Sequence, residues 1–118
     1  VIISSFNEPL WTGAAYPLNF HTITPSKKIT DCMTGWILRW QAYNRDAGTV
    51  VNSDFHYVHI PKIHVINNNG AGVRFVLERD GVGTISKYVY VYNDRIVGHD
   101  SNHLGANYHI VLSGVFEY

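Results

Sequence analysis

The most regular pattern of apolar and polar side chains lies between residues 35 and 43. With a period of two, one face of an extended chain is apolar there, and the other face is mixed. The apolar face comprises Trp36, Leu38, Trp40 and Ala42, and the mixed face comprises Ile37, Arg39, Gln41 and Tyr43. Two tryptophans four residues apart would also share a helix face, but Gly35 breaks the chain before them and residues 44–48 have the composition of a loop. The pattern predicts a central core strand that buries both tryptophans.

Shorter strands are predicted on both sides of this segment, bounded by glycine, proline and asparagine. They cover residues 10–11, 21–24, 53–60, 73–79, 87–92, 95–98 and 109–118. In the 87–92 strand three tyrosines face one way and two valines the other, and Asn93 and Asp94 form a hairpin turn after it. Gly114 suggests a bulge in the last strand or a close approach of another backbone. No helical period persists along the chain, so we expect no α-helix longer than about two turns. The expected fold is all-β, an antiparallel sandwich or partly closed barrel, jelly-roll-like.

Length, charge and cysteine content narrow the class of protein. The 118 residues suit a single domain, residues 1–118, that buries a core without disulfides. Cys32 is the one cysteine, so it can form neither an internal bridge nor a CxxC zinc site. Nine basic and nine acidic residues cancel, which argues against a nucleic acid or a membrane surface as partner. Because the chain starts without methionine and without a signal-peptide pattern, we expect a piece of a longer protein.

Patterns that would indicate catalysis are weak. The sequence has no GxSxG motif, and no histidine adjoins Cys32 in sequence, although a histidine could adjoin it in space. Carboxylates that could supply a glycosidase pair are Asp46, Asp54, Glu78, Asp80, Asp94 and Asp100, but a β domain of this size offers such pairs by chance. The spacings of His56 with His59 and of His99 with His103 bring rings together on a helix and not on strands or loops. We expect neither catalysis nor a cofactor, and a structural metal is the less favoured alternative.

Topology indicates where a ligand would bind. If the strands run up and down in turn, the loops 43–54, 80–86 and 99–108 share one rim of the fold, and the loop 61–72 shares the other with the 93–94 turn. The first rim is rich in side chains that donate and accept hydrogen bonds. From it we select Tyr43 as an aromatic platform, Asn44, Arg45, Asp54, His56, Asp100 and Asn102 as hydrogen-bonding groups, and His99 and His103 as further donors. Such a mixture suits a polar, uncharged ligand such as a saccharide.

Several motifs taken together resemble a known family. They are Leu10-Trp11-Thr12-Gly13, the segment from Thr22 to Ile29, Asp31-Cys32, the segment from Gly35 to Trp40, Ile60-Pro61-Lys62, the segment from Lys87 to Val91, and Ile96-Val97-Gly98-His99. This set is similar to the C-terminal receptor-binding head domain of tail-tip and baseplate proteins from phages of Gram-positive bacteria such as streptococci and lactococci. Where that family often has an acidic pair and an aromatic after the second tryptophan, this chain has Tyr43-Asn44-Arg45-Asp46.

The resemblance implies a trimeric β head at the distal end of the virion tail, which binds a saccharide of the host cell wall without cleaving it. It also implies that other tail or baseplate proteins are held through a preceding part of the longer protein. The apolar stretch 110–118 and the side chains of Ile37, Tyr43 and Val89 lead us to expect a homotrimer. The alternative function is a structural attachment module that holds another virion protein, which would need a larger apolar patch.

Overall fold

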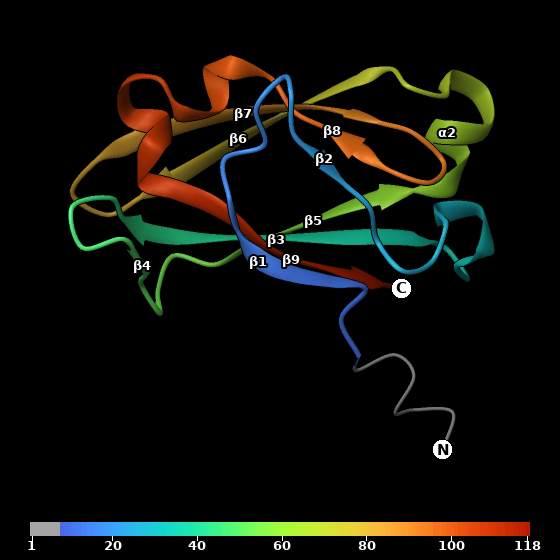
Figure 1. Ribbon diagram of the computed structural model, residues 1–118, viewed down its shortest axis with the longest axis horizontal. Coiled ribbons are helices and arrows are strands. Elements are labelled where there is room, and N and C mark those ends of the chain that lie inside the picture. Colours follow the sequence, from blue (N-terminus) through green and yellow to red (C-terminus); the bar gives the residue numbers. More distant parts are fainter. Residues whose placement is uncertain (1–7) are drawn as a thin grey trace.

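Two antiparallel sheets enclose one hydrophobic core in the computed structural model, which describes residues 8–118 (Figure 1). In the first sheet, β1 (Trp11–Ala15) pairs with β9 (Ile110–Glu117), and β9 pairs with β3 (Gly35–Asn44). Two further strands, β4 (Thr49–Val50) and β5 (His56–Pro61), pair with the other edge of β3. The second sheet has the order β2 (Thr22–Ile23), β8 (Ile96–Val97), β7 (Gly83–Val91), β6 (Gly72–Arg79). Because β1 pairs with β9 and β2 with β8, the strands are nested as in a jelly roll. The expected all-β sandwich is confirmed.

Strand β3 is the centre of the first sheet, as its alternation predicts. It pairs with β9 along one edge and with β5 and β4 along the other. All four side chains of its apolar face are completely buried. The indole N–H of Trp36 donates to the carbonyl of Lys27 at 3.1 Å, whereas the indole N–H of Trp40 has no hydrogen-bond partner among the described residues. The core therefore satisfies the indole N–H of Trp36 and leaves that of Trp40 unsatisfied.

Strand β9 lies between β1 and β3 and is irregular at its middle. Arg39 of β3 is opposite Gly114, but the next residue, Trp40, is opposite Leu112, so Ser113 is the extra residue of a β-bulge. The bulge expected at Gly114 is therefore present. Residues 110–115 are buried within this chain, and Val89 is completely buried in the core. The expectation that residues 110–115 and Val89 leave apolar surface for trimer contacts is therefore wrong. Of the other side chains chosen for that reason, Ile37, Tyr43, Phe116 and Tyr118 are half-buried, and the trimer itself stays a prediction.

Short helices occupy connections that the sequence pattern left as loops. Among residues 8–118 the one α-helix is α2 (Lys62–Asn68), which has seven residues, or about two turns, and agrees with the expected limit. The same residues form three 3₁₀ helices, η1 (Ile29–Asp31), η2 (Asp100–His103) and η3 (Gly105–His109). Within residues 8–118, none of the helices has the length and apolar character needed to cross a membrane.

A lysine inside the core fixes the segment that contains η2 and η3. Lys87 lies on the valine face of β7 and is 0% exposed. Its ammonium donates to the carbonyl of Asn102 at 2.7 Å and to those of Asn107 and Ile110 at 2.5 Å. Burial lowers the pKa of Lys87 from 10.5 to about 7. The charge has no carboxylate partner among the hydrogen bonds of the described chain, so backbone carbonyls solvate it, and the ring centres of Tyr16 and Trp40 lie 5.4 and 5.6 Å from the ammonium.

Candidate functional site

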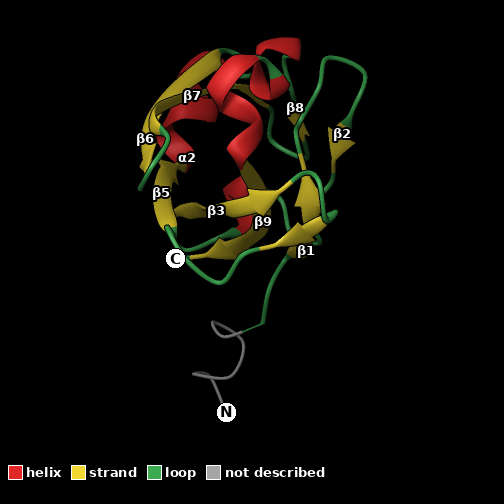
Figure 2. Cartoon of the chain, turned by 90° about the vertical axis from the view of Figure 1, so that its left-hand side faces the viewer, coloured by secondary structure: helices red, strands yellow, loops and turns green. Residues whose placement is uncertain are grey.

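Three connections that are distant in sequence meet at one end of the sandwich, on the left in Figure 1 and toward the viewer in Figure 2. The N–H of Asp80 in the β6–β7 turn donates to a carboxylate oxygen of Asp54 at 3.3 Å. The guanidinium of Arg45, after β3, lies 3.6 Å from the ring centre of Tyr108 in η3. We call this end the polar rim; it comprises residues 43–46, 54–56, 78–83 and 108–109.

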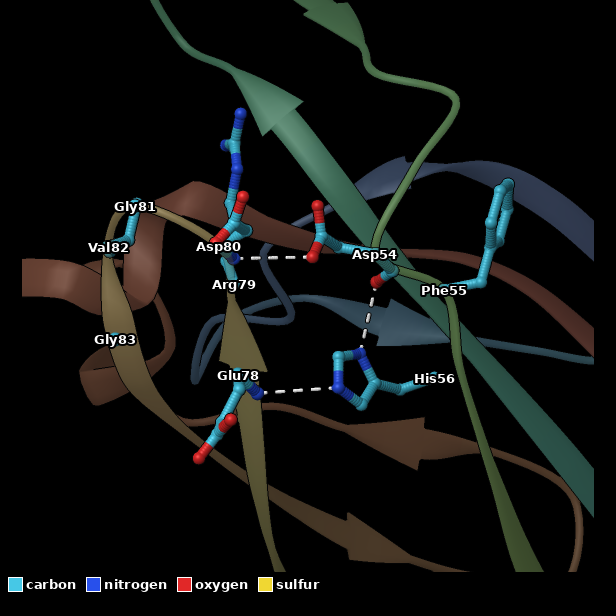
Figure 3. A pocket seen from close by; sticks show the side chains of 9 residues that line it. All are labelled: Asp54, Phe55, His56, Glu78, Arg79, Asp80, Gly81, Val82 and Gly83. Carbon is cyan, nitrogen blue, oxygen red and sulfur yellow. Dashed lines mark hydrogen bonds between the residues drawn. The ribbon is translucent and has the colours of Figure 1, made fainter.

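The larger pocket of the polar rim has a volume of about 620 Å³ and opens between β5 and the β6–β7 turn (Figure 3). Residues 54–56 form one wall and residues 78–83 the other. Asp54 holds the walls together, because its carboxylate accepts from the N–H of Asp80 and from the hydroxyl of Ser53 at 3.0 Å. Its backbone has φ 55°, a left-handed conformation that aspartate tolerates better than most side chains do.

His56 joins the two sheets at the base of this pocket. Its Nε2 accepts from the N–H of Glu78 at 3.3 Å, so this nitrogen carries no proton. The other nitrogen, Nδ1, lies 3.0 Å from the carbonyl of Asp54 and therefore donates to it. Figure 3 shows His56 and Asp54 directed toward β6, whereas the ring of Phe55 points away from it. Both nitrogens of His56 are thus occupied, and the histidine positions the pocket walls.

The smaller pocket, of about 220 Å³, lies beside the first and shares Arg79 with it. Tyr43, Asn44, Arg45, Asp46, Arg79, Tyr108 and His109 line it. One guanidinium nitrogen of Arg79 donates to the carbonyls of Tyr43 at 2.8 Å and His109 at 2.9 Å, so this β6 side chain ties the end of β3 to the start of β9. Burial, followed by the nearby charges of Arg79 and Arg45, lowers the pKa of His109. The imidazole therefore favours its neutral form beside the two guanidinium groups.

Charge is divided between the two pockets. Carboxylates of Asp54, Glu78 and Asp80 surround the larger pocket, with Arg79 as the cation among its lining residues. The smaller pocket has two guanidinium groups, Arg45 and Arg79, and the carboxylate of Asp46. One side of the polar rim thus offers mainly hydrogen-bond acceptors and the other mainly donors.

The nine site residues selected from sequence separate into two groups. Five of them line the two pockets: Tyr43, Asn44, Arg45, Asp54 and His56. The four residues His99, Asp100, Asn102 and His103 lie in or next to η2, outside both pocket linings.

Most polar side chains of the η2 group form hydrogen bonds to other residues of the domain. The ring of His99 accepts from the N–H of Ser101 at 3.1 Å, and the carboxylate of Asp100 accepts from the N–H of Asn19 at 3.2 Å. Asn102 is completely buried, and its amide donates to the carbonyls of Pro17 and Tyr88 and accepts from the N–H of Tyr88. The expectation that Asn102 faces a ligand is therefore wrong. His103 is half-buried at the end of η2.

Sequence reasoning missed several residues of the polar rim. They are Phe55, Glu78, Arg79, Asp80, Tyr108 and His109. Glu78 and Asp80 were considered only as carboxylates for catalysis, and Tyr108 lies within the 99–108 loop of the expected rim. The contacts of Asp80 with Asp54 and of Tyr108 with Arg45 join segments that are distant in sequence. No alternation within one strand predicts such contacts.

The geometry defines a class of protein: an all-β sandwich with two polar pockets at one end that tyrosine and phenylalanine side chains help to line. Within the described part of the chain, no three histidine, cysteine, aspartate or glutamate side chains are arranged to hold a metal ion. Comparisons with protein-family models, with curated proteins and with solved structures found no match to this chain.

Proposed function

We propose that this domain is a phage receptor-binding head that recognises a saccharide of the host cell wall without cleaving it. The observation that carries the proposal is the pair of adjoining pockets around Arg79, where carboxylates, guanidinium groups and aromatic rings lie together. Saccharides present many hydroxyl groups and weakly polar ring faces, so their sites combine these same groups. The resemblance in sequence supports the same function.

Preorganisation of the charged groups supports a binding role. Arg45 is stacked on Tyr108, and Arg79 is held by two carbonyls, so both guanidinium groups lose little freedom when a ligand binds. Asp54 is held similarly by Asp80 and Ser53. Rigid donors and acceptors give a site its selectivity among sugars that differ in the direction of one hydroxyl.

Hydrogen bonding at Asp54 supports binding without cleavage. A glycosidase needs one carboxylic acid that gives a proton to the leaving oxygen and a second carboxylate across the bond. Both oxygens of Asp54 accept hydrogen bonds, one from the hydroxyl of Ser53 and one from the N–H of Asp80, so the carboxylate is already held as an acceptor. Asp54 therefore suits the recognition of a hydroxyl better than the donation of a proton.

The proposal extends to the assembly. The domain acts as a homotrimer at the distal end of the virion tail, joined to other tail or baseplate proteins through a preceding part of a longer chain. Three copies of a weak saccharide site would give strong adhesion to a repetitive cell wall through avidity. Light scattering of the purified domain tests the trimer, and a monomer at tens of micromolar would contradict trimer formation by this domain alone.

A second candidate is a structural attachment module that holds another virion protein. It is favoured by exposed apolar side chains away from the polar rim: Met33, Ile63 and Ile66 are each more than half exposed. Lys62, at the start of α2, donates to the carbonyl of Cys32, so the start of α2 and the segment with Met33 are neighbours. Such a patch suits protein docking better than sugar binding.

Adsorption to isolated cell walls tests the two candidates. We expect Arg45→Ala and Asp54→Asn to weaken binding to walls of a susceptible Gram-positive strain by about tenfold or more, because a trimer multiplies the loss at each site. Asparagine at position 54 keeps an acceptor and tolerates the left-handed backbone, so the melting temperature should change little.

Arg95→Ala is the matched control for Arg45→Ala. Arg95 also stacks on a tyrosine, with its guanidinium 3.9 Å from the ring centre of Tyr92, but it lies next to the 93–94 turn at the opposite end of the fold. The Arg95→Ala variant should therefore bind cell walls as strongly as the parent does. If both rim variants adsorb normally while Lys62→Ala or Ile66→Ser abolishes adsorption, the assignment of the saccharide site to the polar rim is wrong. If the parent itself does not adsorb to the walls, the attachment module is the better assignment.

A further inference from the structure

A row of rings follows the outward face of β5. Residues 56, 58 and 60 of this segment turn inward, and Phe55, Tyr57 and His59 turn outward. Phe55 is 37% exposed and Tyr57 is 55% exposed. The planes of these two rings are within 14° of parallel, with centres 6.2 Å apart. They form an ordered aromatic surface instead of two separate exposed side chains.

The row continues across the first sheet. The ring of Tyr118 meets His59 edge-on, with centres 4.7 Å apart. Arg39 is directly opposite Tyr57 in the register of β3 with β5, so it shares the outward face. Its guanidinium donates to Ser113 and lies 5.0 Å from the ring centre of Phe116. We call Phe55, Tyr57, His59, Tyr118 and Arg39 the outer row.

The outer row starts at the larger pocket. Phe55 lines that pocket and is also the first ring of the row. Figure 3 shows its ring on the side of the chain away from His56, so Phe55 borders the pocket and carries the first ring of the outward face. Side chains two residues apart on a strand are separated by about 7 Å, so the outward residues of β5 offer regularly spaced contacts to an extended ligand.

We propose that the outer row is an extension of the polar rim that binds the successive sugar rings of an oligosaccharide. The larger pocket takes one sugar through Asp54 and the β6–β7 turn, and Phe55, Tyr57 and His59 take the rings that follow it. This inference rests on the proposed function and specifies its ligand as a chain of several sugars and not a single terminal sugar.

The shape of the outer row favours a glycan over a second copy of this chain. Three of its five side chains follow β5, and Arg39 and His59 interrupt its apolar rings with hydrogen-bonding groups. A stable protein interface needs about 800 Å² on each partner with an apolar centre. Alternating rings and polar groups along a narrow path match the alternating apolar faces and hydroxyls of a sugar chain.

Calorimetric titration with a size series tests the inference. The probe is polysaccharide released from Gram-positive cell walls and separated into fragments of one to several repeats. We expect the parent to bind longer fragments more tightly. Tyr57→Ala should bind the long fragments about tenfold more weakly and the shortest fragment unchanged, whereas Tyr57→Phe, which keeps the ring, should restore most of the gain. Phe20→Ala is the matched control, because Phe20 is an exposed ring outside the outer row.

The outcomes separate the two proposals. If short fragments bind but length has no effect, or if Tyr57→Ala keeps the dependence on length, the extended site is wrong and the rim site stands. If no fragment binds the parent, both are wrong. If Tyr57→Ala instead changes the oligomeric state seen by light scattering and leaves the length dependence unchanged, the outer row is an interface between copies.

Discussion

Replacing Lys87 by methionine removes a buried charge while keeping a side chain of similar length. Lys87 is completely enclosed, and three carbonyls accept from its ammonium. The substitution removes the cost of burying the charge, but it leaves three buried acceptors without their donor, at about 1–3 kcal/mol for each. These effects oppose each other, so the pH dependence of stability is more diagnostic than stability at one pH.

The sign of the pH dependence follows from the direction of the shift. The pKa of Lys87 is lowered from 10.5 to about 7 in the folded protein, so between these values the unfolded chain binds more protons than the folded chain. The free energy of unfolding therefore rises with pH in that window. Below pH 7 the lysine destabilises the fold by about 5 kcal/mol relative to strongly alkaline pH, and about 3 kcal/mol of this is recovered between pH 6 and pH 9.

Urea unfolding at pH 6, 7, 8 and 9, followed by tryptophan fluorescence, measures how the contribution of Lys87 to the free energy of unfolding changes with pH. The parent should gain about 3 kcal/mol over the series relative to Lys87→Met. The histidines titrate in both proteins, so they largely cancel in the comparison. A difference between parent and variant that is flat, or that falls as pH rises, would refute the claim that Lys87 is charged at a cost in the core.

Three further predictions concern the core. Trp36→Phe should lower the free energy of unfolding by about 1–2 kcal/mol more than Trp40→Phe, measured by urea unfolding, because only the Trp36 indole loses a hydrogen bond. Equal losses would contradict this difference. Gly98→Ala should prevent stable folding, seen as loss of cooperative thermal unfolding, because a Cβ at this position would lie 1.9 Å from the backbone of Pro17. Cys32 should react with a thiol reagent much more slowly in the native than in the unfolded protein, since burial raises its pKa; equal rates would show that the thiol is accessible.

Local alternation was sufficient to predict the strands whose faces differ clearly in polarity. The apolar face of β3 is buried as predicted, and the tyrosines and valines of β7 lie on opposite faces as predicted. The same alternation places Lys87 on the inward face of β7, together with Val89 and Val91, but a lysine there normally indicates a surface strand. What allows its burial is a set of three carbonyls from residues 102–110, and no local pattern reveals them.

Helix α2 and the complete site were beyond local reasoning for a related reason. In α2 only Val65 is buried, while Ile63 and Ile66 are exposed, so the helix lacks the apolar stripe by which sequence patterns are recognised. The alternation of strand directions along the sequence was enough to predict that the loops after β3 and before β5 lie at the same end as the β6–β7 turn. They could not show that Arg79 would be shared between two pockets, or that Asn102 would turn inward.

The position of β9 has a consequence for how the chain folds. Trp11 of β1 is paired with Val115 of β9, and β9 also forms the long edge of β3, so the first sheet joins segments about a hundred residues apart. By contrast, β6 and β7 form a hairpin that closes through the short turn at residues 80–82. Closing a long loop costs more conformational entropy than closing a short one, so the hairpin can form early and the first sheet late. Refolding from denaturant is expected on a timescale of roughly milliseconds to seconds, with protection of amide hydrogens in β6 and β7 preceding protection in β1 and β9.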